Sequence, residues 1–432
     1  MRRDIVHSGA KNLSYAIREI VQIGYTMQEL GQEIVWENIG DPIQKGEKLA
    51  PWIKQALFDV ASEERSWGYC DTAGVKATRQ FLSAKVNERP GGVQITPDDI
   101  IFFNGLGDAV SKVYSFIRRE ARVIGPTPAY STHSSAEAAH SGYDHLTYEL
   151  DPDNHWMPDL DDLRMKVKYN DAIAGILLIN PDNPTGAVYP REVLEGMVAI
   201  AREFDLFVIA DEIYAHIVYN GHQTLHLSQV IGDVPAIAMR GISKEFPWPG
   251  SRCGWIEVLN RDKDATFNTY VDSLLASKRL EVCSTTMPQL CIPPVIGDAR
   301  YPGHLKARAE MFERRAREAT EILSTVPGAH VNCPSGAFYI TVTFDPAALS
   351  NRQTLDIQSS DVRAMVEKLT QTTSLDARFV YYLMGSTGIC TVPLTGFCCK
   401  RPGFRATLLE CDDEKRNWTF QTIADAMRRY LA

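Results

Sequence analysis

The stretch Gly175-Ile-Leu-Leu-Ile179 is a fully apolar run, and Leu206-Phe-Val-Ile-Ala210 is a second run of the same kind further along the chain. Residues 193–204, between the two runs, have the pattern of a helix. Further apolar runs occupy residues 121–124 and 254–259. Apolar runs of this length that alternate with helices indicate parallel strands buried on both faces. We therefore predict an α/β fold in which a mostly parallel sheet is sandwiched by helices.

The final part of the chain predicts a second, smaller α/β domain. A chain of 432 residues is too long for one ordinary compact unit. A long charged helix at 304–323, strands near 336–343 and a helix from Asn417 differ in pattern from the middle of the chain. The domains that we predict are an N-terminal arm that is part of the small domain (1–50), a large domain (51–310) and a small C-terminal domain (311–432).

Composition excludes several classes of partner. The formal net charge of −9 argues against nucleic acid and against a polybasic membrane surface. We find neither an apolar run long enough to span a bilayer nor a signal-peptide pattern. Nine cysteines with irregular spacing fit free thiols in a reducing cytoplasm. The pair Cys398-Cys399 does not indicate a metal site, because adjacent cysteines without a nearby histidine are poor tetrahedral ligands.

A lysine follows another strand-like run, Ala236-Ile-Ala-Met-Arg240, in the motif Gly241-Ile-Ser243-Lys244. At the end of a buried strand a lysine loses solvation, so its pKa falls and its neutral amine can act as a nucleophile. Arg252 follows with a guanidinium that can bind a phosphate in a bidentate way. Alone this motif is weak, because most lysines are solvated surface groups.

Two further strand ends carry polar groups, at the edge where such sheets bind ligands. Asp211 places a carboxylate at a buried strand end, which is costly unless a cation such as a protonated pyridine nitrogen faces it. Tyr214 could then place its hydroxyl on the phenolic oxygen of the same ring. The turn Asn180-Pro-Asp-Asn183-Pro-Thr-Gly186 presents an amide to an oxygen anion. Taken alone, a helix-capping aspartate explains the Asp211 motif equally well, and an ordinary turn is the more common explanation of the Asn-Pro motif.

A small-residue turn, Phe103-Asn-Gly105-Leu106-Gly107-Asp-Ala-Val110, follows the strand-like run 100–103. A turn of this kind that opens a helix exposes backbone N–H groups to a phosphate. The motif is also similar to a dinucleotide fingerprint, but Val110 replaces the third glycine. A nicotinamide cofactor therefore loses its main support.

Together these motifs resemble the fold-type I pyridoxal-phosphate enzymes, class I and II aminotransferases. The order and spacing of five residues carry the resemblance, namely Asn183, Asp211, Tyr214, Lys244 and Arg252. Further matching segments extend over nearly the whole chain; they are Asn38-Ile-Gly40-Asp-Pro42, Trp67-Gly-Tyr69-Cys-Asp-Thr-Ala-Gly74, Pro126-Thr-Pro-Ala-Tyr130, Pro334-Ser-Gly-Ala-Phe-Tyr339 and Phe404-Arg405-Ala-Thr407.

The resemblance implies a set of site residues. Lys244 would hold pyridoxal 5'-phosphate as a Schiff base and later act as a base, with Asp211 and Tyr214 completing the catalytic set. The cofactor-binding residues that it implies are Leu106, Gly107, Tyr130, Asn183, Asp211, Tyr214, Ser243, Lys244, Arg252 and, from a second subunit, Tyr69. The substrate-binding residues that it implies are Gly40, Asn183, Arg405 and, at the entrance, Tyr15 and Arg18. A tyrosine supplied by a second subunit implies a homodimer.

Within the family, several segments are most similar to the bacterial glutamate–pyruvate (alanine) aminotransferase branch. They are Tyr15-Ala-Ile-Arg18, Gly68-Tyr-Cys-Asp71, Trp156-Met-Pro-Asp-Leu-Asp-Asp-Leu163 and Asn183-Pro-Thr-Gly-Ala-Val-Tyr189. The similarity implies transfer of an amino group from an L-amino acid, with alanine as first choice, to 2-oxoglutarate or pyruvate. Aspartate and aromatic amino acids are the alternative donors.

The chain departs from the family in three places, one of which is a longer segment between Leu280 and Gln289, where Ser284 or Thr285 could supply a phosphate contact. Gly241 stands where many relatives carry a phosphate-binding serine, so Ser243 and the backbone of residues 106–107 would have to compensate. The segment 391–402, which includes the two adjacent cysteines, differs just before Arg405. That segment should shape the entrance, so the substrate is the least determined part of the assignment.

Two other functions remain open at this stage. A carbon–sulfur β-lyase would use the same cofactor and the same constellation of residues. A ligand-sensing or interaction module could keep the fold without the chemistry, because fold alone does not fix function. A sensor usually carries an added DNA-binding segment, for which the short N-terminus leaves no room.

Overall fold

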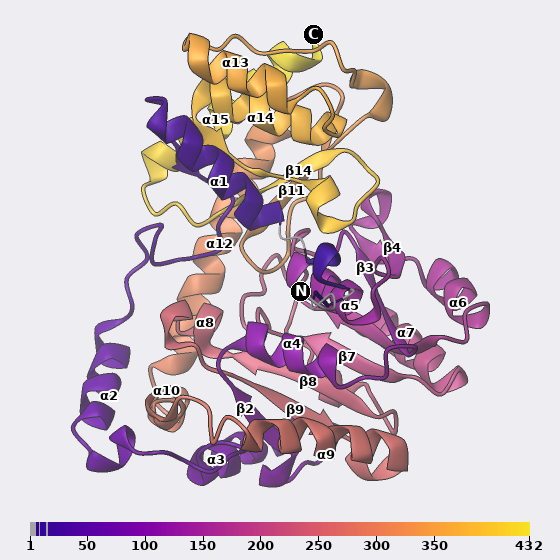
Figure 1. Cartoon of the computed structure of the whole chain (residues 1–432). Helices are drawn as coiled ribbons and strands as arrows, with labels where there is room; N and C mark the ends of the chain where they lie inside the picture. Colours follow the sequence, from indigo (N-terminus) through magenta and orange to yellow (C-terminus); the bar gives the residue numbers. More distant parts are fainter. Residues whose placement is uncertain (1–5, 8, 14–15) are drawn as a thin grey trace.

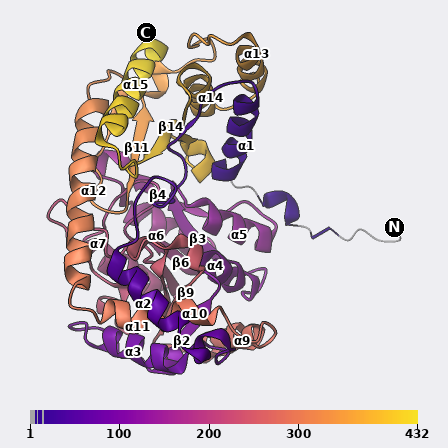
Figure 2. The same cartoon turned by 90° about the vertical axis from the view of Figure 1, so that its left-hand side faces the viewer.

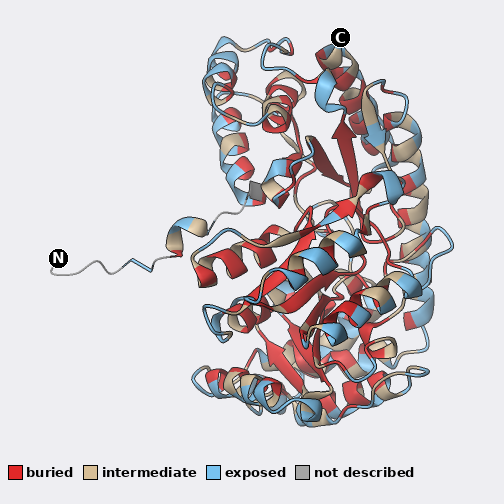
Figure 3. Ribbon diagram, turned by 90° about the vertical axis from the view of Figure 1, so that its right-hand side faces the viewer, coloured by how far each residue is buried: buried red, intermediate tan, exposed pale blue. Residues whose placement is uncertain are grey.

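The computed structural model describes residues 6–7, 9–13 and 16–432, so the predicted entrance residue Tyr15 lies outside the described residues. The chain is built around two main sheets, of eight and four strands, and helices surround both (Figure 1). We call the part built on the eight-stranded sheet the large lobe and the part built on the four-stranded sheet the small lobe. Figure 3 shows the strands of both sheets as buried and the outer sides of the surrounding helices as exposed.

The large-lobe sheet has the strand order β2-β9-β8-β7-β6-β3-β4-β5. Its strands are β2 (Ile100–Phe103), β3 (Arg122–Thr127), β4 (Thr147–Asp151), β5 (Met157–Pro158), β6 (Ile173–Ile179), β7 (Phe207–Asp211), β8 (Ala236–Gly241) and β9 (Gly254–Leu259). The pairs β8–β7, β7–β6, β6–β3 and β3–β4 are parallel. The predicted mostly parallel sheet is confirmed.

Strand β9 runs against the parallel pattern. It pairs antiparallel with both β8 and β2. After β8 the chain makes only a short helix, α8 (Ile242–Glu245), and a turn before β9 begins beside the end of β8, with Gly241 opposite Gly254. A parallel strand needs a crossover that carries the chain back to the other end of the sheet, whereas the connection 242–253 begins and ends at the same edge, with Gly254 opposite Gly241.

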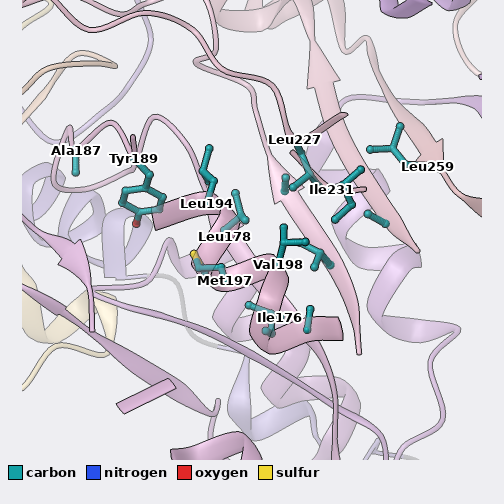
Figure 4. Packing of buried hydrophobic residues seen from close by; sticks show 14 of the residues in the cluster. Ile176, Leu178, Ala187, Tyr189, Leu194, Met197, Val198, Leu227, Ile231 and Leu259 are labelled. Carbon is teal, nitrogen blue, oxygen red and sulfur yellow. The ribbon is translucent and has the colours of Figure 1, made fainter. Parts of the chain in front are cut away.

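Alternate residues of the central strands pack against helices on opposite faces of the sheet. Leu177 and Ile209 belong to the cluster that includes α4 and α9, whereas Ile176 and Leu178 belong to the cluster that includes α6 and α7 (Figure 4). The large-lobe helices are α2 (Pro51–Ala61), α3 (Lys76–Asn87), α4 (Leu106–Ser115), α5 (Ser131–Ser141), α6 (Leu160–Lys168), α7 (Arg191–Glu203), α8, α9 (Ala265–Arg279), α10 (Thr286–Leu290) and α11 (Ile292–Ile296).

The small lobe combines the C-terminal part of the chain with the N-terminal segment. Its sheet, in the order β10-β11-β14-β13, is antiparallel throughout. Its strands are β10 (Ala329–Val331), β11 (Tyr339–Phe344), β13 (Val392–Pro393) and β14 (Gly403–Thr407). A separate parallel pair joins β1 (Val35–Trp36) to β12 (Ile389–Cys390), so the N-terminal segment packs with this lobe.

Helices cover the small lobe and connect it to the large one. They are α1 (Ala16–Glu29), α12 (Tyr301–Leu323), α13 (Ser360–Leu369), α14 (Leu375–Thr387) and α15 (Asp413–Leu431). The predicted helix at 304–323 corresponds to α12, which runs along both lobes (Figure 2). The domain bounds 1–50, 51–310 and 311–432 stay a prediction. Among the described residues, we find no helix whose length and apolar character would allow it to cross a membrane.

The large-lobe core provides a direct stability test. Leu177 is 0% exposed on β6, so Leu177→Ala is expected to lower the free energy of unfolding by about 2–5 kcal/mol, because it leaves a cavity among packed side chains. Met165, 51% exposed on α6, provides the control, and Met165→Ala should change stability by less than about 0.5 kcal/mol. Urea unfolding followed by fluorescence measures both. Equal effects of the two substitutions would contradict the assignment of Leu177 to the core.

Candidate active site

A cavity of about 600 Å³ lies between the two lobes, where β6, β7 and β8 end. Parallel sheets place their ligands at this carboxyl edge. Most of the residues singled out in the sequence line it; they are Arg18, Gly40, Leu106, Gly107, Tyr130, Asn183, Asp211, Tyr214, Ser243, Lys244, Arg252 and Arg405. Residues that are far apart in the chain thus share one cavity.

Lys244 lies on α8, directly after β8. Its Nζ donates a hydrogen bond to the carbonyl oxygen of Gly40 at 2.6 Å. Burial lowers the pKa of Lys244 to about 8, and the positive charges of Arg252 and Arg405 act in the same direction, while Asp41 opposes them. A larger share of the amine is therefore neutral near pH 7 than for an exposed lysine, as a nucleophile requires.

Arg308, an arginine that the sequence analysis did not single out, holds the backbone of Lys244 in place. Arg308 of α12 donates from Nη1 to the carbonyl oxygen of Lys244 at 2.6 Å. Its Nε donates to Glu47 at 2.6 Å, so the guanidinium joins α12, the loop after Gly40 and the lysine. No local pattern marks Arg308, because it is one of many charged residues on a long helix.

The first turn of α4 forms one end of the cavity together with Arg252. Gly105 precedes the helix with φ +86°, and a Cβ at this position would lie 2.4 Å from Nη2 of Arg252. The guanidinium thus rests against the backbone that leads into α4. The first N–H groups of a helix have no intrahelical acceptor, so those of Leu106 and Gly107 are available beside this cation. Such a combination favours a phosphate.

Asp211 also lines the cavity and is 3% exposed. Its Oδ1 accepts from the backbone N–H of Ile213 at 3.1 Å, and its Oδ2 lies 3.2 Å from Nε2 of His133. Nδ1 of His133 lies 3.2 Å from the hydroxyl of Tyr114. If His133 carries its hydrogen on Nε2, it donates to Asp211 and accepts from Tyr114.

His133 is a residue that the sequence prediction missed. It lies three residues after Tyr130, at the beginning of α5, and its side chain is fully buried. The only signal in the sequence is this spacing, which places a residue one helical turn after the tyrosine. A histidine in that position is more often a packed core residue, so the contact with Asp211 becomes visible only in the folded chain.

Tyr214 and Tyr339 meet in the cavity with their hydroxyl oxygens 2.9 Å apart. Burial raises the pKa of Tyr214 well above its usual value, and the Tyr339 hydroxyl adds to this shift. Tyr214 therefore keeps its proton and can donate a hydrogen bond. Tyr339 belongs to the segment 334–339 quoted above, but the sequence did not identify it as a site residue.

Arg405 reaches the cavity from β14 of the small lobe and is 1% exposed. Its Nη1 donates to Oδ1 of Asn183 at 3.0 Å, and its Nη2 donates to the carbonyl oxygen of Asn38. Both acceptors are neutral oxygens, and the buried Nε has no hydrogen-bond partner among the residues that the structure describes. A buried guanidinium without a counter-charge is costly, so this arrangement is suited to an anionic ligand.

Of the predicted site residues that the structure describes, Tyr69 is the one that does not line the cavity of its own chain. Its side chain is 85% exposed in the turn after residues 64–67. Arg18 lines the outer part of the cavity from α1. Tyr15, the other predicted entrance residue, falls outside the described residues.

These residues fit pyridoxal phosphate. One cavity brings together a lysine amine, a phosphate-type site at α4 and a buried carboxylate at Asp211, which suit the aldehyde, the phosphate and the ring nitrogen respectively. Gly105 leaves room for the Arg252 guanidinium, and the unpartnered Nε of Arg405 marks a separate place for a carboxylate.

Comparison with known proteins agrees with this geometry. Residues 33–417 match the family aminotransferase class I and II. The chain belongs to this family. It is therefore a pyridoxal-phosphate-dependent aminotransferase. The expected family and cofactor are confirmed.

Several relatives cover most or all of the chain. The uncharacterized aminotransferase MJ1479 of Methanocaldococcus jannaschii is 51% identical over 431 residues, which is 100% of both chains. The glutamate-pyruvate aminotransferase AlaA of Escherichia coli strain K12 is 30% identical over 342 residues, which is 78% of this chain and 82% of AlaA. The structure of an alanine aminotransferase from Pyrococcus furiosus aligns with a TM-score of 0.83 and 25% identity, covering 97% of this chain and 98% of that one.

The lowered pKa of Lys244 predicts the pH dependence of cofactor attachment. Only the neutral amine attacks an aldehyde, so covalent capture of pyridoxal phosphate by the apoprotein should accelerate as pH rises through about 8 and then level off. Borohydride trapping at fixed times, followed by mass spectrometry of the Lys244 peptide, measures the rate, with Lys244→Ala as the blank. A midpoint near 10.5, the usual value for lysine, would contradict the effect of burial.

Proposed function

We propose that this aminotransferase moves the amino group of a small L-amino acid, first of all L-alanine, to 2-oxoglutarate, and that it also runs the reverse reaction from L-glutamate to pyruvate. The observation that carries the proposal is the buried Arg405 guanidinium, which lines the same cavity as Lys244 and, within the part of the chain that the structure describes, donates hydrogen bonds only to neutral oxygens. The choice of donor is supported by the similarity to AlaA, a protein named for glutamate and pyruvate.

Each residue of the site receives a role under this proposal. Pyridoxal phosphate supplies an aldehyde that bonds to amines and a ring that takes up electrons from the carbon beside the nitrogen. Lys244 removes the proton from the α-carbon of the substrate, a task suited to an amine with a pKa near 8. Asp211 holds a proton on the ring nitrogen, and His133 keeps Asp211 oriented.

Other residues fix the position of the reacting groups. Arg405 binds the α-carboxylate and thereby orients the bond from the α-carbon to its hydrogen. Asn183 and Tyr214 hold the phenolic oxygen of the cofactor. Tyr130 stacks on the ring. The phosphate contacts are assigned to Leu106, Gly107, Ser243 and Arg252, which compensate for the glycine at position 241.

The outer part of the cavity would receive the side chain of the substrate. Ile17, Arg18 and Ile39 line the cavity, and we assign them to this part. The apolar side chains of Ile17 and Ile39 accommodate a methyl group, whereas the Arg18 guanidinium suits the second carboxylate of glutamate or 2-oxoglutarate. The two partners of the alanine–glutamate pair thus find complementary groups in one cavity. We also assign Tyr15 to this entrance.

We further propose that the active unit is a homodimer in which Tyr69 of the partner subunit contacts the phosphate. The exposure of Tyr69 in its own chain supports this assignment, because a tyrosine that is 85% exposed has most of its surface available to another subunit. Trp67 beside it is 70% exposed, which adds apolar surface to the same region.

A cytoplasmic location is part of the same proposal. All nine cysteines fall within the described residues, and each is a free thiol. Free thiols persist in reducing compartments and are commonly paired in oxidising ones.

Spectral titration tests the donor. Addition of L-alanine or L-glutamate to the holoenzyme should convert the visible absorbance of the bound cofactor to the near-ultraviolet band of its amine form, and L-aspartate should do so more weakly. Lys244→Ala should stay folded and lose conversion by at least about 1,000-fold, because no other base replaces the lysine. Pyruvate and ammonia formed from cystathionine without an oxo acid would instead indicate a β-lyase, and conversion by Lys244→Ala would reject the role of the lysine.

Hybrid dimers test the position of Tyr69. Subunits with Lys244→Ala lack the base, and subunits with Tyr69→Ala lack the phosphate contact, so each parent should be impaired. In a hybrid, the intact Lys244 of one subunit meets the intact Tyr69 of the other if the tyrosine acts across the interface. Unfolding the two parents, mixing them and refolding them together should then yield more activity than either parent alone. Mixed activity equal to the average of the parents would show that Tyr69 does not act in the neighbouring site.

A further inference from the structure

The guanidinium of Arg405 is held by aromatic rings as well as by hydrogen bonds. Its central carbon lies 4.3 Å from the ring centre of Tyr339 and 5.0 Å from that of Phe397. An aromatic face attracts a cation, and the attraction is strongest where water is excluded. Because Arg405 and Phe397 are 1% and 0% exposed, these contacts are fully desolvated.

Phe397 is outside the cavity lining, so it acts on a substrate only through Arg405. It ends the short helix η9 (Leu394–Phe397), in the segment 391–402 that departs from the family pattern. The hydrogen bonds of Arg405 fix only its two Nη atoms, to Asn183 and Asn38. The rings supply contacts in a different direction and thus restrict rotation of the guanidinium plane.

Three successive carbonyl groups connect this segment to the large lobe. The oxygens of Gly396, Phe397 and Cys398 accept hydrogen bonds at 3.0, 2.6 and 2.9 Å. Their donors are the Ser131 hydroxyl, the Ala129 backbone N–H and the Thr127 hydroxyl, which surround Tyr130 in the chain.

The same segment is held from the small lobe. Asp376, which is 0% exposed, accepts from the backbone N–H and the hydroxyl of Thr395 at 2.9 and 3.0 Å. Cys398 has φ +60°, a conformation that favours glycine, and such a residue persists only when its surroundings fix it. The backbone of Phe397 is thus anchored on both sides.

We propose that Phe397 is a positioning residue that orients Arg405 for a carboxylate, and that the hydrogen bonds from Thr127, Ala129 and Ser131 hold it there. This inference rests on the proposed role of Arg405. Carboxylate recognition then depends on contact between the lobes, because the ring that orients the arginine is itself held by the segment that carries Tyr130.

Selectivity for the carboxylate tests this role. The half-reaction of the holoenzyme is measured with L-alanine and with ethylamine, which is alanine without its carboxylate; if another donor is preferred, that donor and its decarboxylated amine are used. We define the preference as the ratio of the half-reaction rate with the amino acid to the rate with its decarboxylated amine. Phe397→Leu should lower this ratio about 10-fold, the size of a desolvated cation–aromatic contact, and leave the ethylamine rate unchanged. Equilibrium binding of propionate, which needs no turnover, should weaken by the same factor.

Two further variants keep the test independent of the folding of Phe397→Leu. Thr127→Val with Ser131→Ala retains the ring and removes two of its anchors, so the preference should fall about 3-fold. Phe379→Leu is the matched control, since Phe379 is equally buried in the small lobe but packs against Phe344 and Phe404. It should leave the preference unchanged.

Arg405→Gln separates the two proposals. If Arg405 binds the carboxylate, this variant loses the preference and the binding of propionate. If Arg405→Gln keeps both, the proposed role of the arginine fails. If Arg405→Gln loses both while Phe397→Leu and the Thr127/Ser131 double variant keep them, or if Phe379→Leu loses as much, the positioning role of Phe397 is overturned.

Discussion

Strands β6, β7 and β8 pair in parallel register, and the positions of Asn183, Asp211 and Lys244 depend on this pairing. Ile179 lies beside Asp211, and Asp211 beside Met239, so β6 and β7 end at the same level and β8 ends two residues later, at Gly241. The pairing continues past the strand ends, where the N–H of Asn180 donates to the carbonyl of Asp211 at 3.0 Å. The turn that holds Asn183, the carboxylate of Asp211 and the helix that carries Lys244 therefore begin at one edge. A shift in register would turn each side chain to the opposite face of the sheet.

Charges buried at this edge set the chemistry of the cavity. Lys244 shares it with the guanidinium groups of Arg252 and Arg405, and their repulsion adds to the effect of burial on the lysine pKa. Asp211 lines the same cavity and is stabilised by His133 and a backbone N–H. Among the described residues, negatively charged groups do not fully balance the positive charges of Lys244, Arg252 and Arg405, as expected for a site that binds a phosphate and a carboxylate.

Under the proposed function, the small lobe contributes the group that distinguishes amino acids from other amines. Arg405 sits on β14 opposite Thr341 of β11, and its Nη1 crosses to Asn183 of the large lobe. The segment that ends in Phe397 also crosses, through backbone carbonyls that accept from residues 127–131. Substrate recognition is thus distributed over both lobes, whereas the lysine, the phosphate-type site and Asp211 belong to the large lobe alone. Movement between the lobes would change carboxylate binding before it changed the other contacts.

The sequence by itself determined the parallel strands and their polar ends, because apolar runs between helices have few other structures available and strand-end residues meet at one edge. It also indicated the family and its cofactor through the order of Asn183, Asp211, Tyr214, Lys244 and Arg252. Only the tertiary structure decided the antiparallel direction of β9, the contact of His133 with Asp211 and the position of Phe397 beside Arg405. These features join residues from separate segments, and no local pattern records a contact that arises when two distant elements pack together.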